Sequence, residues 1–496
     1  LMSIKIPFFR SVRDKSVDCV PGLSECIQNN DNILLVGNGF DLALGKQTKY
    51  QDYLLYLFVI CLLKNIKFDG DNDEYSFIAE LNNFLKSQDN VNQDIINVIN
   101  IVEKRLDLDD DCSFSLLYNV NNESSFLELL IKVIFQNLPL NSYLRPIEYN
   151  GSIVPTIKIT HFDFAFPVTK DKYFPASPNL NIVTNFSDTS LEKLFSCICK
   201  FYDDLSSEIQ KNNLYGWLDI EAFIEYLVLN DELLDNRFVN SKVFRQYLDK
   251  VGFSKGLYVD IKRSDIIYRS LYLFTIEFCK FVSLQESLNN KTNLALKFDN
   301  ETSKYKLSSD SCANRKDIIY VQYKLEQFIT SIIDFNYSNT THEVCSINYK
   351  TRQPLDIYHV NGKCDNLSAV FGYTNTKQIK VNREAFKFEK RTQRILKNVP
   401  SVDFVKLTSI PFNLFIFGHS CSTADRDILE PLLKSKSLQF VIVFCYSEED
   451  KISIYKNLCE ILGYEHIDHL MRQTDSTSQR LLWAIYEDKT TDKNKL

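Results

Sequence analysis

The 496-residue chain is poor in residues that interrupt regular structure, with only 13 glycines and 12 prolines. Because both residues disfavour helix interiors, their scarcity favours long helices with few breaks. The chain also lacks an excess of positive charge, since its formal net charge is −7. A negative balance gives no general attraction to nucleic acid or to an anionic membrane surface, so we expect neither as a partner.

Paired cysteines and long apolar runs are missing as well. The 13 cysteines are scattered singly and no Cys-x-x-Cys occurs, which argues against a zinc ribbon or a thioredoxin-like site. An odd number of unpatterned cysteines is typical of reduced thiols in a cytosolic protein. The first residues contain no apolar signal-peptide core, and the apolar run 53–63 is too short to cross a bilayer. We therefore expect a soluble, cytoplasmic protein.

Short apolar runs alternate with helical patterns near both ends of the chain. The run 33–36 precedes a glycine turn and a helix, and the middle of the chain is dominated by helical patterns. Later apolar runs lie at 328–335, 355–360, 369–373, 413–417 and 439–446, with helical patterns at 383–398, 425–435, 448–462 and 478–487. Strands that alternate with helices predict βαβ units and a mostly parallel sheet.

The fold class that this pattern predicts is α/β, with a mostly parallel, Rossmann-like sheet interrupted by a large, mainly helical insertion. We place the α/β nucleotide-binding-like domain at 31–65 plus 325–490 and the insertion at 66–324, after a lead-in at 1–30. An irregular patch at 142–185 predicts a small sheet or an extended excursion, and a hairpin through 305–307 is an option.

Polar motifs follow four of the predicted strands, where ligands collect in open α/β sheets. They are Gly37-Asn38-Gly39-Phe40-Asp41, Phe335-Asn336-Tyr337-Ser338-Asn339-Thr340, Tyr358-His359-Val360-Asn361-Gly362-Lys363, and Phe417-Gly418-His419-Ser420 with Asp425 and Asp427. A glycine turn between a strand and a helix directs backbone N–H groups at a phosphate. The alternative is an ordinary tight turn between strand and helix.

These motifs, taken together and in this order, resemble the AbiH-type phage abortive-infection family. The residues that carry the resemblance are Gly37-Asn-Gly-Phe-Asp-Leu-Ala43 with Thr48 and Tyr50, Trp217-Leu-Asp219-Ile-Glu221, Phe335-Asn-Tyr-Ser-Asn-Thr340, His359-Val-Asn-Gly362, and Gly418-His-Ser420 with Asp425. Two positions depart from the family pattern: Asn361 stands where a second histidine is usual, and Cys421 where a leucine is usual. The resemblance implies a bacterial anti-phage role.

The same order of motifs is similar, more distantly, to the sirtuin-like NAD-binding fold. This likeness implies NAD or a related nucleotide as ligand or substrate, with no metal, and the paired cysteines of the deacetylases' zinc module are absent. It places Gly37, Asn38 and Gly39 at the phosphates and Gly418 with Ser420 at the adenosine side. Asn336 would contact the ribose and His359 would act as base. Asp41 and Thr48 are further expected nucleotide-binding residues. The predicted activity is hydrolysis of the N-glycosidic bond by Asn336 and His359.

Other interpretations stay open at this point. His359 also suits a core histidine, Asn336 a turn cap, and Asp41 the first turn of a helix. A non-catalytic nucleotide-sensing module would use the same cleft, and a metal-dependent nuclease would use Asp219, Glu221 and Glu225. A phage-derived trigger and a homo-oligomer are further expected partners.

Overall fold

The computed structural model describes two compact units of the chain. Their extents are Leu1–Lys46, Asn290–Lys363 and Arg394–Leu496 for the first unit, and Gln47–Asn289 and Cys364–Gln393 for the second. The described residues are 23–46, 48–49, 51–53, 55–56, 59–60, 74–88, 91–107, 148–149, 152–153, 167–169, 172–173, 198–199, 202–203, 263–288, 305–308, 319–320, 328–344, 354–374, 385–471 and 480–486. The domain boundaries inferred from the sequence stay a prediction.

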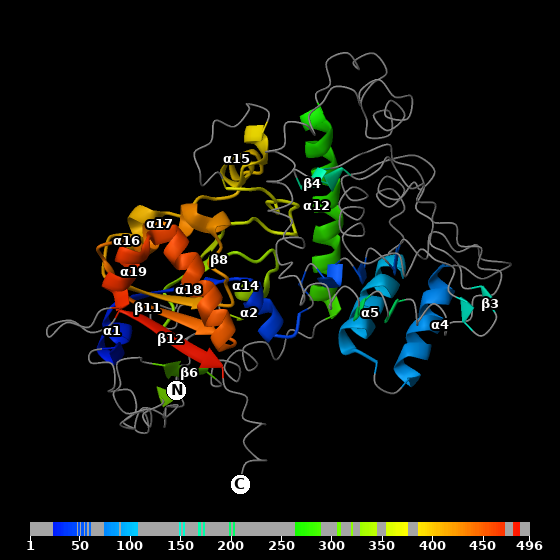
Figure 1. The fold of residues 1–496 in the computed structure, drawn as a ribbon, viewed down its shortest axis with the longest axis horizontal. Coiled ribbons are helices and arrows are strands. Elements are labelled where there is room, and N and C mark those ends of the chain that lie inside the picture. Colours follow the sequence, from blue (N-terminus) through cyan, green and yellow to red (C-terminus); the bar gives the residue numbers. More distant parts are fainter. Residues whose placement is uncertain are drawn as a thin grey trace, which may run out of the picture. The chain divides into compact units, whose positions relative to one another are not determined.

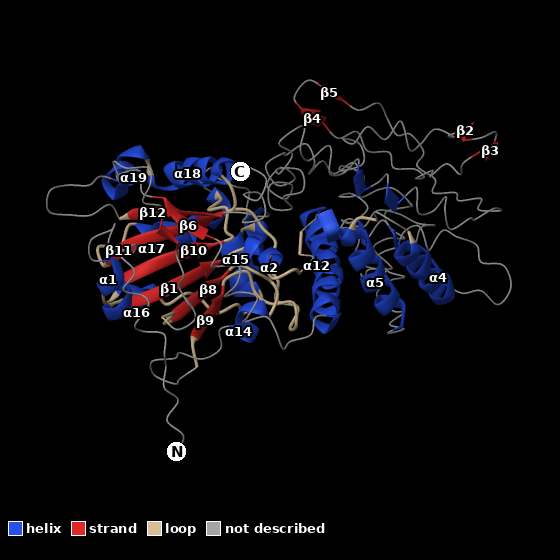
Figure 2. Cartoon of the chain, turned by 90° about the horizontal axis from the view of Figure 1, so that it is seen from below, coloured by secondary structure: helices blue, strands red, loops and turns tan. Residues whose placement is uncertain are grey.

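The first unit is built on an eight-stranded sheet, shown in red in Figure 2, with the order β7-β6-β12-β11-β10-β1-β8-β9. Its strands are β1 (Asp31–Val36), β6 (Tyr305–Ser308), β7 (Ile319–Tyr320), β8 (Ser331–Asp334), β9 (Asp356–His359), β10 (Phe412–Phe417), β11 (Leu438–Cys445) and β12 (Leu481–Tyr486). The six strands from β12 to β9 are all parallel to their neighbours, and β6 and β7 extend one edge in antiparallel fashion. The predicted α/β fold with a mostly parallel sheet is confirmed.

The strand order is that of dinucleotide-binding folds. Numbered along the chain, the parallel strands β1, β8, β9, β10, β11 and β12 lie in the spatial order 3-2-1-4-5-6. The order reverses between β1 and β10, which is the place where ligands bind in such sheets. Successive parallel strands need crossover connections, which explains why helices lie on both sides of this sheet (Figure 1).

The helices of the first unit cover both faces of the sheet. They are α1 (Leu23–Asn29), α2 (Asn38–Ala43), α14 (Thr340–Val344), α16 (Phe404–Thr408), α17 (Arg426–Leu433), α18 (Glu448–Leu462) and α19 (Tyr464–Met471), with a 3₁₀ turn at Thr423–Asp425. Side chains alternate along β1, so Ile33 and Leu35 pack in one core with α16 to α19, while Leu34 and Val36 pack in the other with α1, α2 and α14. Burial on both faces explains the continuous apolar strand sequences.

Two elements differ from the sequence-based expectations. The segment 478–487, expected to be helical, contains strand β12, which pairs with β11 and buries Trp483 and Leu482 on opposite faces. Periodicity does not separate a short apolar helix from a strand buried on both faces, and here the tertiary pairing decides. The segment 369–373, expected to be a strand, forms only a single bridge from Tyr373 to Glu389.

The second unit is helical in its larger described elements. They are α4 (Glu74–Ser87), α5 (Gln93–Asp107), α12 (Arg263–Leu288) and α15 (Lys390–Leu396), whose end lies in the first unit, with a 3₁₀ helix at Ala385–Phe388. An aromatic cluster surrounds Tyr53, whose ring stacks with Tyr56 and meets Phe278 edge-on. The patch 142–185 contributes two short antiparallel pairs, β2 (Glu148–Tyr149) with β3 (Ser152–Ile153) and β4 (Pro167–Thr169) with β5 (Lys172–Tyr173). Among the described helices, none has the length and apolar character needed to cross a membrane.

Candidate functional site

The register of the sheet brings the polar motifs of the first unit to one edge. Val36 pairs with both Phe417 and Asp334, and Asp334 pairs with His359. These four residues therefore form one row across β10, β1, β8 and β9. Because the strands are parallel, the residues that follow each of them emerge at the same carboxyl edge.

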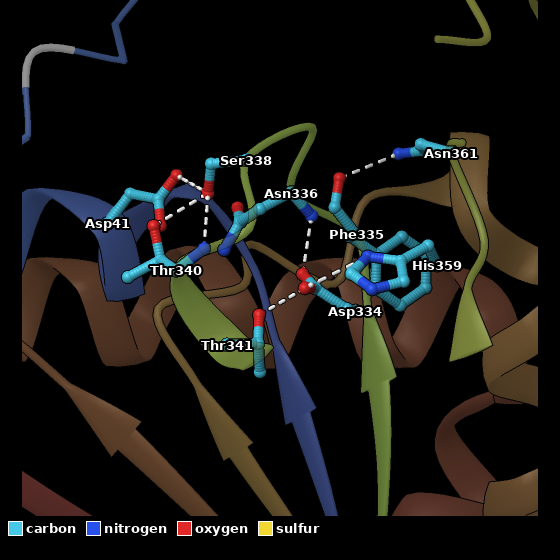
Figure 3. A network of polar contacts seen from close by, with 9 residues as sticks. All are labelled: Asp41, Asp334, Phe335, Asn336, Ser338, Thr340, Thr341, His359 and Asn361. Atoms are coloured by element: carbon cyan, nitrogen blue, oxygen red, sulfur yellow. Dashed lines mark hydrogen bonds and ion pairs between the residues drawn. The ribbon is translucent and has the colours of Figure 1, made fainter. Parts of the chain in front are cut away.

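Asp334 is the centre of the site, and its carboxylate contacts three groups (Figure 3). The backbone N–H of Asn336 donates to Oδ1 at 2.8 Å, and the Thr341 hydroxyl donates to Oδ2. The His359 Nδ1 atom lies 3.3 Å from Oδ2. This fully buried carboxylate fixes the strand end that precedes Asn336 and stands beside the imidazole.

Asn336 and His359 are brought together around this carboxylate, as the motif order predicted. They are 3 % and 8 % exposed, yet Asn336 Nδ2 and both ring nitrogens of His359 make no hydrogen bond among the described residues; His359 Nδ1 has only the 3.3 Å ion-pair contact with Asp334. Figure 3 shows the Asn336 amide extending towards Thr340, on the side of Asp334 away from the His359 ring. Leaving a buried polar atom unpaired costs about 1–3 kcal/mol, so these orphaned atoms point to a bound group or water.

The neighbouring Asn361 supports this strand end. Its Nδ2 donates to the Phe335 carbonyl at 3.1 Å, while its Oδ1 has no partner among the described residues. Gly362 takes a positive φ of 74° in the turn that follows and donates its N–H to the His359 carbonyl. The loop after β9 is therefore folded back on the residue that carries the imidazole.

His419 lies at the same edge but differs from His359 in having both ring nitrogens engaged. Its Nδ1 accepts the Cys421 N–H at 3.0 Å, and its Nε2 lies 3.3 Å from the Asp425 carboxylate. The ring also packs against Phe335, with centroids 4.2 Å apart. This arrangement is that of a structural histidine.

The glycines of the first motif pack against the last motif. A Cβ on Gly37 would lie 2.7 Å from the Gly418 carbonyl oxygen, and one on Gly39 would lie 2.6 Å from the Gly418 Cα. The Gly37 N–H donates to the Phe417 carbonyl and the Gly39 N–H to the Gly418 carbonyl. Both N–H groups are thus engaged inside the protein, and the backbone contact itself explains why glycine is needed. Their role at the phosphates stays a prediction.

Asp41 links helix α2 to the loop after β8. Its Oδ2 accepts the Ser338 hydroxyl at 2.7 Å, and the Ser338 and Thr340 hydroxyls lie 2.7 Å apart. Burial raises the pKa of Asp41 to about 7, against the lowering effect of the Ser338 hydrogen bond. Its carboxylate is 1 % exposed and its Oδ1 has no partner among the described residues.

The raised pKa of Asp41 predicts a pH-dependent stability. The folded protein holds a proton on Asp41 that the unfolded chain releases near pH 4, so the free energy of unfolding falls as the pH rises from about 4 to about 7. Asp41→Asn mimics the protonated form. Relative to the wild type, we expect it to become more stable by about 1.4 kcal/mol for each pH unit between 5 and 7.

Thermal or denaturant unfolding at pH 5, 6, 7 and 8 measures this difference. Asp403→Asn is the matched control, because Asp403 is an exposed helix cap that accepts the Lys406 N–H at 2.9 Å and an asparagine oxygen replaces it. Parallel pH profiles of the wild type and Asp41→Asn would contradict the assignment.

The remaining predicted residues lie outside this cluster. Asn38 and Ser420 are exposed, and Ser420 offers its backbone carbonyl to Asn457 at 2.9 Å. Thr48 is buried and belongs to the second unit. Trp217, Asp219, Glu221 and Glu225 lie outside the described residues, so the nuclease alternative stays a prediction.

Sequence reasoning missed Asp334, Thr341 and Arg394. Asp334 directly precedes the Phe335-Asn336 motif, and a carboxylate in the last position of an apolar strand was the available signal. Arg394 stands in α15, 34 residues from Val360, whose carbonyl accepts its Nε–H at 2.7 Å. Nothing in the local sequence distinguishes it from other helix arginines.

Fold and site together define a doubly wound α/β protein of the Rossmann type, with a buried polar cluster at the carboxyl ends of its central strands. The chain belongs to the AbiH family: the model of that family, bacteriophage abortive infection AbiH, matches residues 33–446. Its role is therefore in abortive infection. The match begins in β1 and ends just after β11, so it includes every strand of the candidate site. Comparisons with curated proteins and with solved structures gave no match.

Proposed function

We propose that the first unit binds NAD or a related nucleotide and hydrolyses its N-glycosidic bond, with Asn336 and His359 as the central residues. The observation that carries the proposal is the pair of buried, unpartnered nitrogens, Asn336 Nδ2 and His359 Nε2, found among the described residues at the ends of adjacent strands. The Rossmann strand order supports a nucleotide as the ligand, because such sheets bind nucleotides at this edge.

The proposed chemistry uses His359 as general base. Nδ1 lies 3.3 Å from the Asp334 carboxylate, so the proposal places the ring proton on Nδ1 and uses Nε2 as the proton acceptor. Nε2 takes a proton from water as the water oxygen bonds to the anomeric carbon. At the same time the bond between this carbon and nicotinamide breaks, and nicotinamide leaves with the electron pair. Asp334 stabilises the imidazolium that forms.

Asn336 serves a different part of the ligand in this proposal. Its side chain extends towards Thr340, away from the imidazole, and its Nδ2–H donors are free to bind a ribose oxygen (Figure 3). A fixed amide dipole near the anomeric carbon orients the sugar before the positive charge of the oxocarbenium-like transition state develops. The Asp41 oxygen that lacks a described partner supplies an acceptor for a ribose hydroxyl nearby.

The site is closed in this form of the protein. Both His359 ring nitrogens lie below the surface, so a nucleotide reaches them only after neighbouring side chains move. A closed site suits an abortive-infection protein, whose damage to the cell must wait for infection. The proposal therefore includes an opening step, which the free protein undergoes transiently and which phage infection favours.

The test is NAD consumption during infection. Cells that express the wild-type protein and are protected from a phage are expected to lose most of their NAD and release nicotinamide after infection. His359→Ala and Asn336→Ala are each expected to abolish both the NAD loss and the protection. Liquid chromatography of cell extracts measures both metabolites, and plaque counts measure protection.

His342→Gln is the matched control, since His342 is exposed on α14 beside the site. It is expected to keep both readouts. NAD loss that persists in His359→Ala and Asn336→Ala would overturn the assigned site. Protection without NAD loss, abolished by the same two substitutions, would overturn hydrolysis of NAD and favour the alternative of a nucleotide-sensing module.

A further inference from the structure

Arg394 is a buried cation attached to the loop that carries His359. Its side chain is 10 % exposed, and its Nε–H donates to the carbonyl of Val360, the residue after His359, at 2.7 Å. Its Nη1 pairs with Asp427 on α17. Its Nη2, with two further N–H donors, has no hydrogen-bond partner among the described residues.

The planar guanidinium determines where these two donors point. Nε–H and Nη2 lie along the same edge of the group, while Nη1 projects from the other end. Because Nε–H donates to the Val360 carbonyl, one Nη2–H donor faces the same side, which is the loop after His359, and the second points along the edge shared with Nη1. Asp427 occupies Nη1 and so leaves the edge beside the candidate site available.

The charge around the site shows why this donor matters for a nucleotide. A phosphate needs a positive charge or free N–H donors, and the buried side chains Asp41 and Asp334 are acidic. The Gly37 and Gly39 N–H groups already donate to carbonyl oxygens within the protein. Of the lysines and arginines described in the first unit, Lys46 and Arg394 are the buried ones. Lys46 lies 3.8 Å from the Glu343 carboxylate.

We propose that Arg394 binds a phosphate group of the nucleotide through Nη2, next to the loop that carries His359. The proposal rests on the proposed function for the identity of the ligand, but it makes no use of bond cleavage. A guanidinium edge suits a phosphate oxygen, and the Val360 carbonyl and Asp427 hold the group in place before the ligand arrives.

Calorimetric titration of the purified full chain with ADP-ribose and with adenosine tests the proposal. ADP-ribose carries the diphosphate and adenosine carries none. Arg394→Gln is expected to weaken ADP-ribose binding about 10- to 100-fold while adenosine binding stays within about twofold. Arg394→Lys keeps the charge without the planar edge, so an intermediate loss confined to ADP-ribose is expected.

Arg426→Gln is the matched control. Arg426 lies in the same unit and pairs with Glu430, but its Nη2 donates to the Ile461 carbonyl at 2.7 Å. It is expected to change neither affinity. If Arg394→Gln does not fold, Arg394→Lys tests the proposal: a fall in the ratio of ADP-ribose affinity to adenosine affinity supports the phosphate contact, and an unchanged ratio contradicts it.

An equal loss for both ligands, no loss for either, or a wild type that does not bind ADP-ribose would overturn the role of Arg394. None of these results depends on nicotinamide release. Conversely, selective loss of ADP-ribose binding in a protein that never releases nicotinamide would retain the phosphate site and remove the hydrolysis.

Discussion

Asp334→Asn is expected to lower infection-triggered NAD hydrolysis about 100- to 10,000-fold, by analogy with the loss of the carboxylate in serine-protease triads. In the wild type, the carboxylate lies 3.3 Å from His359 Nδ1 and offers a negative charge to the imidazolium. An asparagine of the same shape offers no charge. Its amide also allows either the oxygen or the NH₂ group to face the ring, so the imidazole loses its preferred orientation.

The substitution also creates a hydrogen-bonding conflict. The Asn336 N–H and the Thr341 hydroxyl both donate to this carboxylate, one to each oxygen. An asparagine supplies one acceptor oxygen, and its NH₂ group would oppose one of these donors. The loss of activity must therefore be measured per amount of folded protein, with thermal unfolding and circular dichroism as the check on folding.

Thr341→Val separates the two effects. It removes one donor to Asp334 and leaves the carboxylate beside the imidazole, so a loss of about 10-fold or less is expected. A folded Asp334→Asn protein with wild-type NAD loss would contradict the role of Asp334. A Thr341→Val loss as large as that of Asp334→Asn would show that local packing, and not the charge, carries the effect.

Much of the sheet could be predicted because its strands carry their own signal. The apolar runs at 33–36 and 414–417 are buried on both faces, and continuous apolar character is what such strands require. The meeting of Asn336 with His359 followed from the order of motifs along the chain together with the rule that parallel strands share one carboxyl edge.

What could not be predicted depends on partners distant in sequence. Apolar and polar residues do not alternate along strand β12, so only its pairing with β11 distinguishes it from a helix. The role of Asp334 follows from its registration beside His359, and that of Arg394 from a carbonyl 34 residues away. The packing of Gly37 and Gly39 against Gly418 could not be predicted either, because Gly418 belongs to a motif far away along the chain.

That packing contact makes Gly418 a position where one methyl group should cost much stability. Gly418 has a φ of +64°, and a Cβ there would lie 2.3 Å from the Phe40 nitrogen and 2.4 Å from the Gly39 carbonyl carbon. Both contacts are backbone atoms of the turn after β1, so no side chain can move aside. We expect Gly418→Ala to lower the free energy of unfolding by about 4 kcal/mol or more.

Two further glycines separate the causes of this loss. Gly463 has a φ of +84°, and a Cβ added there would meet no atom within 4 Å, so Gly463→Ala measures backbone strain alone, about 1–3 kcal/mol. Gly39→Ala would place its Cβ 2.6 Å from the Gly418 Cα and measures the close approach. Urea unfolding of the three variants gives the comparison. Equal losses in Gly418→Ala and Gly463→Ala would mean that the close approach between the turns after β1 and β10 adds nothing to the cost of backbone strain, and would contradict the contact.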